Sequence, residues 1–87
     1  MKPLVIHSIE FTPLAEKQFL KLERLMQERI KNSLERAKSN PFIYFFKLSG
    51  VDFYRMRVGD YRVIADIDQG KLLILVVKVG KRENVYD

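Results

Sequence analysis

The apolar residues of the chain follow a helical period in the first half and a strand period in the second. Between Pro13 and Ser39 they recur every three to five residues, with charged and amide side chains between them, at Leu14, Phe19, Leu22, Met26, Ile30, Leu34 and Ala37. This spacing is typical of an amphipathic helix. Thr12 is placed to cap its start with Pro13 in the first helical position, and Asn40-Pro41 ends it.

The helical segment is too long to form one straight helix in a domain of this size. A single helix over residues 13–39 would be roughly 40 Å long, whereas a folded chain of this length has a radius of gyration of about 12 Å. We therefore predict a helical hairpin that bends between Lys21 and Arg24. The sequence has no glycine or proline there to mark the bend.

Short segments rich in apolar and β-branched residues flank the helical region. Residues 3–9, "PLVIHSI", predict a first strand, and residues 42–46, "FIYFF", predict a strand or a packed extended segment. Three further strands are predicted at 53–58, 61–68 and 71–79. The order predicts an α+β domain: an N-terminal strand, a helical hairpin and an antiparallel β-meander, with the helices packed on one face of a mainly antiparallel sheet of four or five strands.

The first hairpin of the meander brings three arginines together. With Gly59-Asp60 as a two-residue turn, Arg57 pairs with Arg62, and Arg55 pairs with Ile64. Because side chains alternate along a strand, the arginines share one face, and the face toward the helices carries Tyr54, Met56, Val58, Tyr61, Val63 and Ala65. Like charges on facing strands repel, so an anion from outside the chain is expected to bind there.

The second turn decides what lies beside these arginines. With Gln69-Gly70 as a two-residue turn, Arg62 would neighbour Val77 and Tyr61 would neighbour Lys78. The last strand would then bring the basic tail close to the arginines, with Lys81, Arg82 and Tyr86. A guanidinium group donates paired hydrogen bonds to phosphate, and a tyrosine can stack on a base. The pattern predicts a phosphate or RNA site, with an edge strand protected by charge as the alternative.

Composition narrows the class of protein. Eighty-seven residues predict one domain, residues 1–87, and a net charge of +5 favours polyanionic partners. The absence of cysteine excludes a disulfide scaffold and thiolate metal sites and fits a reducing compartment. The apolar runs are too short for a signal peptide or a membrane span. We expect a cytoplasmic protein with no membrane partner.

The segments "YRMRVGDYRV" and "VVKVGKREN", followed by "VY", resemble the RelE toxins of the RelE/ParE superfamily of type II toxin–antitoxin systems, over nearly the whole chain. The resemblance implies a small toxin with the RelE/ParE-like fold. Such a toxin enters the A site of the 30S ribosomal subunit and cuts messenger RNA by attack of a 2′-hydroxyl on the phosphate, with no metal and no small-molecule cofactor. It also implies a cognate acidic RelB-like antitoxin that covers the basic site.

The resemblance assigns roles to individual residues. Two basic residues of the family fall on Arg55 and Arg57, and its catalytic arginines and tyrosine fall on Arg62, Arg82 and Tyr86. Arg62 and Arg82 would stabilise the phosphate, and Tyr86 would orient the nucleotide. The residues expected to bind RNA are Arg55, Arg57, Lys78 and Lys81. The best-known members have lysines in place of Arg55 and Arg57, and an arginine does not act as a base, so the general base stays open.

Two other functions remain open on the sequence alone. One is a ParE-like toxin that inhibits DNA gyrase, and the other is a non-catalytic protein that binds RNA or an antitoxin. The remaining candidate residues are assigned structural or surface positions: His7, Met26, Asp60, Asp66 and Asp68.

Overall fold

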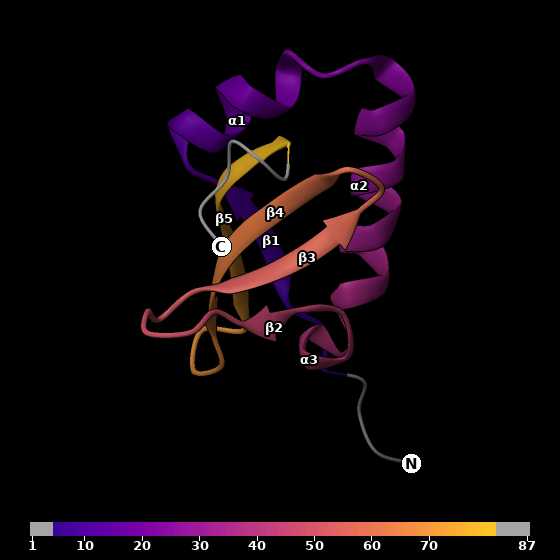
Figure 1. The fold of residues 1–87 in the computed structure, drawn as a ribbon. Helices are drawn as coiled ribbons and strands as arrows, with labels where there is room; N and C mark the ends of the chain where they lie inside the picture. The colour runs from indigo at the N-terminus through magenta and orange to yellow at the C-terminus, as the bar shows by residue number, and fades with distance from the viewer. Residues whose placement is uncertain (1–4, 82–87) are drawn as a thin grey trace.

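Residues 5–81 of this computed structural model are described, and they form one five-stranded sheet and three helices. The elements in chain order are β1 (Ser8–Phe11), α1 (Pro13–Leu20), α2 (Arg24–Ala37), α3 (Pro41–Tyr44), β2 (Phe46–Lys47), β3 (Tyr54–Val58), β4 (Tyr61–Asp68) and β5 (Leu73–Lys81). The strand order is β1-β5-β4-β3-β2, with β1 parallel to β5 and the other neighbouring strands antiparallel (Figure 1). The predicted α+β class is confirmed.

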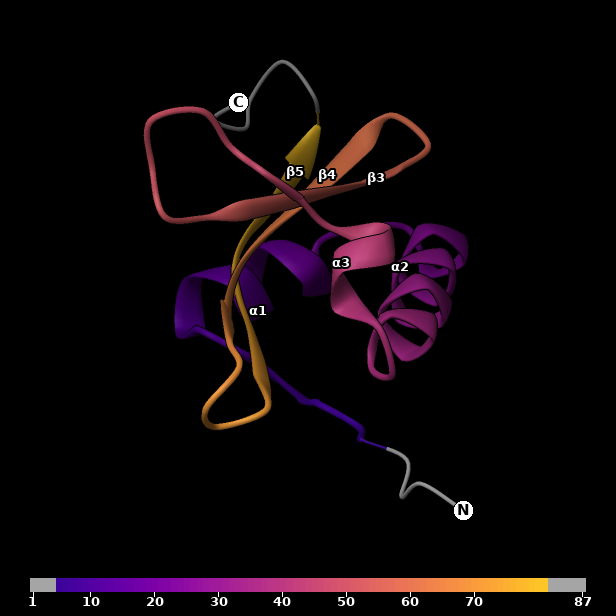
Figure 2. The ribbon, with the colours of Figure 1, turned by 90° about the horizontal axis from the view of Figure 1, so that it is seen from below.

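The helices α1 and α2 lie on one side of the sheet, and the segment that joins β2 to β3 passes over the other side (Figure 2). The core lies between helices and sheet and includes Ala15, Ile30, Leu34, Ala37, Phe45, Met56, Val58, Val63, Ala65, Ile74, Val76 and Val79. The apolar face predicted for β3 and β4 therefore packs on the helices. Met26 also packs against this core, as expected.

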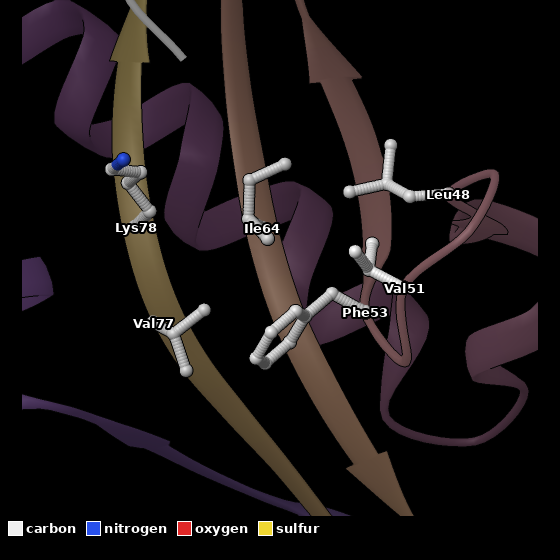
Figure 3. Close-up of a pocket in the computed structure, with 6 residues that line it drawn as sticks. All are labelled: Leu48, Val51, Phe53, Ile64, Val77 and Lys78. Atoms are coloured by element: carbon white, nitrogen blue, oxygen red, sulfur yellow. The ribbon is translucent and has the colours of Figure 1, made fainter. Parts of the chain in front are cut away.

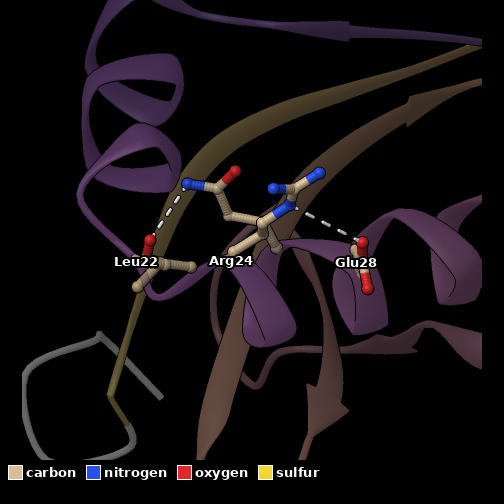
Figure 4. A network of polar contacts seen from close by, with 4 residues as sticks. Leu22, Arg24 and Glu28 are labelled. Carbon is tan, nitrogen blue, oxygen red and sulfur yellow. Dashed lines mark hydrogen bonds and ion pairs between the residues drawn. The ribbon is translucent and has the colours of Figure 1, made fainter.

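The predicted bend between the two long helices is confirmed. The helix α1 starts with the expected cap, because the Ala15 amide donates to Thr12 Oγ1 over 3.2 Å. At its other end, the side-chain amide of Gln27 in α2 donates to the Leu20 carbonyl oxygen over 3.3 Å. It also donates to the Leu22 carbonyl oxygen over 3.0 Å (Figure 4). A side chain of α2 thus satisfies the carbonyl of the last residue of α1 and one carbonyl of the connection between the helices. These bonds stabilise the bend in the absence of glycine or proline.

The first strand is shorter than expected and starts later. It was predicted over residues 3–9, of which 3 and 4 lie outside the described residues, but β1 begins at Ser8, and Val5 and Ile6 are exposed. The backbone amide of His7 donates to the Lys38 carbonyl over 2.8 Å. The ring Nε2 of His7 lies 2.8 Å from Gln69 Oε1. These contacts hold His7 against the end of α2 instead of in the sheet, and they give this buried histidine the structural role expected for it.

The segment "FIYFF" is mostly helical, which corrects the strand or extended segment expected over residues 42–46. Pro41 occupies the first position of α3, where a missing amide hydrogen carries no penalty, and the Phe45 amide donates back to the Pro41 carbonyl over 2.8 Å. Only Phe46 and Lys47 then enter the sheet, as the two-residue strand β2. Phe45 is buried in the core, whereas Phe46 is 60% exposed.

The connection between β4 and β5 also differs from the prediction. A two-residue turn at Gln69-Gly70 was expected, but β5 begins only at Leu73. The Lys71 amide donates to Asp68 Oδ1 over 3.0 Å, and Leu72 has a φ of 51°, so a side-chain cap and a left-handed residue lengthen the turn.

The longer turn changes the register of β5. An irregularity in the pairing at Ile64/Ala65 displaces the register again, and Arg62 lies opposite Gly80 instead of Val77. Because the period of a strand is two, such displacements decide which side chains share a face. The residues that neighbour the arginines on β5 are therefore different from those expected.

Candidate nucleic-acid interface

The arginine-bearing face of the sheet is the one turned away from α1 and α2. In the hairpin of β3 and β4, Arg57 pairs with Arg62 and Arg55 pairs with Ile64, as the Gly59-Asp60 turn predicted. Directly opposed residues have side chains about 5 Å apart at Cβ on the same face. The sheet thus holds Arg55, Arg57 and Arg62 together.

The three arginines differ in exposure. Arg62 is buried, with 1% of its surface exposed, whereas Arg55 is half-buried and Arg57 is exposed. Gly80 lies opposite Arg62 on β5 and has no side chain to compete for this space. Arg62 is therefore a fixed cation within the sheet, and Arg57 is the cation of this hairpin that solvent and ligands reach most freely.

An exposed aromatic ring stands beside the arginines. Phe46 of β2 pairs directly with Arg55, and Phe46, Arg55 and Arg57 line a cavity of about 340 Å³. An aromatic ring flanked by guanidinium groups can stack on a nucleic-acid base while the cations bind the backbone. Phe46 was not among the site residues predicted from the sequence, because it lies in a two-residue strand that carries no periodic signal.

A second, apolar cavity lies on the same face. Its volume is about 350 Å³, and it is lined by Leu48, Val51, Phe53, Ile64, Val77 and Lys78 (Figure 3). Ile64 pairs with Lys78, and the pairing irregularity leaves Val77 as the extra residue on β5. A bulge of this kind places two successive side chains toward one face. Lys78 therefore lies at the rim of an apolar surface that could take a base or an apolar side chain.

The three remaining site residues predicted from the sequence, Lys81, Arg82 and Tyr86, are not seen next to these arginines in the described part of the chain. Lys81 lies opposite Tyr61, where Lys78 was expected, so its register position is on the helix side of the sheet. It is exposed at the end of β5. Arg82 and Tyr86 lie outside the described residues. The structure thus brings Arg55, Arg57, Arg62 and Lys78 to one face, whereas the register position of Lys81 belongs to the other.

The side chains that line the two cavities of this face are cationic, aromatic and aliphatic. Within residues 5–81, no group of three or more histidine, aspartate or glutamate side chains is arranged to hold a metal ion. No helix in the same range is long and apolar enough to cross a membrane.

Comparison of the sequence with known proteins identifies relatives along almost the whole chain. Residues 9–86 match the family model of the ParE toxin of the type II toxin–antitoxin system parDE. A RelE-like toxin protein of Escherichia coli is 33% identical over 86 residues, which cover 93% of this chain and 90% of the relative. The mRNA interferase toxin RelE of Escherichia coli is 32% identical over 78 residues, 86% of this chain and 82% of the relative.

Solved structures share the fold. The isolated RelE toxin of Escherichia coli superimposes with a TM-score of 0.80 at 28% identity, covering 91% of this chain and 87% of that chain. The toxin in the intact Escherichia coli RelBE toxin–antitoxin complex gives a TM-score of 0.78 at 26% identity, covering 90% and 99%. The chain therefore belongs to the RelE-type toxins of the RelE/ParE superfamily of type II toxin–antitoxin systems.

Proposed function

We propose that this toxin is a ribosome-dependent mRNA interferase of the cytoplasm, which cleaves messenger RNA in the ribosomal A site without a metal ion. The observation that carries the proposal is the set of arginines on one sheet face, next to the exposed ring of Phe46. A relative at 32% identity is named as an mRNA interferase. Guanidinium groups and a stacking ring suit a single RNA strand.

The proposed reaction is a transesterification within the message. The 2′-oxygen of one nucleotide attacks the adjacent phosphorus, and the bond from phosphorus to the 5′-oxygen breaks, which leaves a 2′,3′-cyclic phosphate and a 5′-hydroxyl. The 2′-hydroxyl loses its proton, and the leaving 5′-oxygen gains one. Negative charge on the phosphate oxygens grows in the transition state, so cations already fixed in place lower the barrier.

The arginines divide this work according to their positions. Arg57 and Arg62, paired across the hairpin, are proposed to stabilise the phosphate, and Arg55 is proposed to hold the backbone beside the Phe46 ring. Arg82 is proposed as a second charge stabiliser and Tyr86 as the residue that orients the nucleotide, and water is proposed to give the leaving 5′-oxygen its proton, because arginine keeps its own. The roles of Arg82 and Tyr86 rest on the family resemblance, since both lie outside the described residues.

The identity of the general base is proposed to be water. Arginine keeps its proton, so neither Arg55 nor Arg57 can act as the general base. Asp66 lies on the arginine-bearing face of β4, but four residues of strand from Arg62 correspond to about 13 Å, too far for a direct proton transfer. Catalysis would then depend on charge stabilisation and on the ribosome holding the message in an attacking geometry.

Ribosome dependence and metal independence can be tested together. We expect a defined message to be cut on programmed ribosomes and the same RNA to stay intact when free. A phosphorothioate at the scissile phosphate should slow cleavage equally in Mg²⁺ and in Mn²⁺, because no metal ion would contact the sulfur. Efficient cleavage of free RNA would contradict the first claim, and rescue by Mn²⁺ would contradict the second.

Phe46→Ala should weaken binding of the message without unfolding the protein. Loss of one stacked base costs about 1–3 kcal/mol, which corresponds to a rise in KM on programmed ribosomes of about 5- to 150-fold. The ring is 60% exposed, so the unfolding temperature should hardly change. Phe42→Ala is the matched control, because Phe42 is an exposed phenylalanine outside the arginine pocket. Equal KM values for the two variants would refute the stacking role.

An acidic RelB-like antitoxin is the proposed protein partner. The arginine-bearing face and the apolar cavity beside Lys78 together offer cationic and apolar contacts. The RelE toxin of Escherichia coli, which is 26% identical, has been solved in complex with its RelB antitoxin. A peptide with carboxylates around apolar anchors would satisfy both kinds of contact. Such an antitoxin should co-purify with the toxin and abolish cleavage when added in equimolar amount.

Inhibition of DNA gyrase is the second candidate function. It is favoured by the matching family model, which is that of the ParE toxin over residues 9–86. A supercoiling assay separates the two functions, because an mRNA interferase should leave gyrase fully active at concentrations that stop translation. Clear inhibition of supercoiling would favour the ParE-like function.

A further inference from the structure

A second basic pocket lies between α2 and the turn that joins β3 to β4. Its volume is about 240 Å³, and it is lined chiefly by Arg29, Asn32, Ser33, Arg36, Arg57 and Gly59. The turn lies beside α2 in the ribbon view (Figure 1). This pocket is separate from the Phe46 cavity but shares Arg57 with it.

The side chains of this pocket are suited to an anion. Three of the lining residues are arginines, and the other polar side chains are an amide and a hydroxyl, which can both donate hydrogen bonds. No carboxylate of the described residues lines it. Within residues 5–81, neither Arg29 nor Arg36 forms an ion pair, whereas Arg24 on the same helix pairs with Glu28 at 4.0 Å (Figure 4).

The position of Arg29 is unusually close to the turn. A Cβ atom built on Gly59 would lie 3.2 Å from Arg29 Nη1 and 3.4 Å from Nη2. The guanidinium group thus lies against the one residue of the turn that has no side chain, at a backbone φ of 58°. An added Cβ would require the end of the Arg29 side chain to shift by only a few tenths of an ångström, so the glycine is required mainly by its positive φ.

We propose that this pocket binds a phosphodiester group of RNA, next to the nucleotide held by Phe46 and Arg55. The proposal rests on the RNA-directed function proposed above and extends its binding surface from the sheet to α2. Arg57 lines both cavities, so a strand that occupies the Phe46 cavity can continue past Arg57 without leaving cationic surface. The forked guanidinium groups match phosphate oxygens, and amide and hydroxyl donors are common backbone contacts.

The test compares Arg29→Ala/Arg36→Ala with Arg24→Ala/Lys21→Ala. Both double variants remove two exposed cations from the same part of the chain, and only the first removes cations from the pocket. The probes are a single-stranded RNA of eight nucleotides and a dinucleotide, with binding measured by fluorescence anisotropy at several salt concentrations. Thermal unfolding of each variant confirms that it is folded.

We expect the pocket variant to bind the longer RNA less tightly than the native chain does. The slope of log affinity against log salt concentration should become less steep by about 0.7 for each phosphate contact that is lost. The affinity of the pocket variant for the dinucleotide should match that of the native chain, because a dinucleotide fills only the Phe46 cavity. If the phosphate belongs to ribosomal RNA instead of the message strand, the effect will appear only as a raised KM on programmed ribosomes. Either result supports a phosphodiester site and identifies its source.

Two results would overturn the proposal. The first is equal behaviour of the pocket variant and its control with free RNA and on ribosomes. The second is loss of affinity for the acidic antitoxin alone, which would assign the pocket to carboxylates of a protein partner. A native chain that binds RNA through Arg29 and Arg36 but cuts no message would leave this site standing and refute the nuclease function, so the two failures can be distinguished.

Discussion

Arg62→Ala should slow cleavage of the message on ribosomes by about 10²- to 10³-fold, the scale for loss of one preorganised charge-stabilising group. Arg62 is buried in the middle of the sheet opposite Arg57. Its side chain is therefore held in the sheet before RNA binds, but its guanidinium nitrogens are buried, so contact with the phosphate requires the atoms that cover them to move. The effect should appear mainly in kcat, with a smaller change in KM, because the interaction strengthens as charge develops in the transition state. Single-turnover cleavage on programmed ribosomes measures it.

The burial of Arg62 requires a control for folding. Alanine at this position would remove a large buried side chain, so the unfolding temperature of each variant must be measured beside its rate. Arg62→Lys keeps the charge and most of the length but lacks the fork that donates two parallel hydrogen bonds. We expect this variant to fold and to cleave more than tenfold more slowly, by analogy with the loss of a donor. A lysine variant that cleaves at the native rate would contradict the role assigned to Arg62.

Phe45→Ala should destabilise the protein by about 3–5 kcal/mol, the usual cost of removing a buried aromatic ring. Phe45 is 1% exposed and belongs to the core between helices and sheet. For a domain of this size the change corresponds to a fall in unfolding temperature of about 12–40 °C. Phe45 directly precedes β2, so its buried ring also anchors the strand that places Phe46 beside Arg55. Thermal unfolding followed by circular dichroism measures the effect.

The neighbouring phenylalanine gives the matched comparison. Phe46→Ala removes the same side chain one position later, where it is 60% exposed, and should leave the unfolding temperature nearly unchanged. Phe45→Leu retains much of the buried volume and should cost less than Phe45→Ala. Equal unfolding temperatures for the two alanine variants would show that Phe45 neither anchors β2 nor positions Phe46.

The two hairpins show what sequence reasoning could and could not predict about the sheet. The register of β3 and β4 follows from a two-residue turn at Gly59-Asp60, a local feature with a strong residue preference. The turn into β5 depends on a bond from the Lys71 amide to Asp68 Oδ1 and on a left-handed Leu72. Nothing in the dipeptide Gln69-Gly70 indicates either, so the register of β5 was predicted wrongly.

The candidate site was predictable only where it is local to one hairpin. Alternation along β3 and β4 placed Arg55, Arg57 and Arg62 on one face, and the structure confirms that arrangement. The burial of Arg62 and the positions of Phe46 and Arg29 depend on how distant segments pack on that hairpin. A two-residue strand carries no periodic signal, and helical periodicity gives the buried side of α2 without saying which strand end lies beside it.

The nuclease function is tested most directly by the chemistry of the RNA ends produced on ribosomes. The purified toxin is added to ribosomes that carry a defined message in the A site, and the fragments are mapped and their termini identified. We predict a cut within the A-site codon that leaves a 2′,3′-cyclic phosphate on one fragment and a 5′-hydroxyl on the other. An intact message, or fragments that carry a 5′-phosphate, would contradict the proposed reaction.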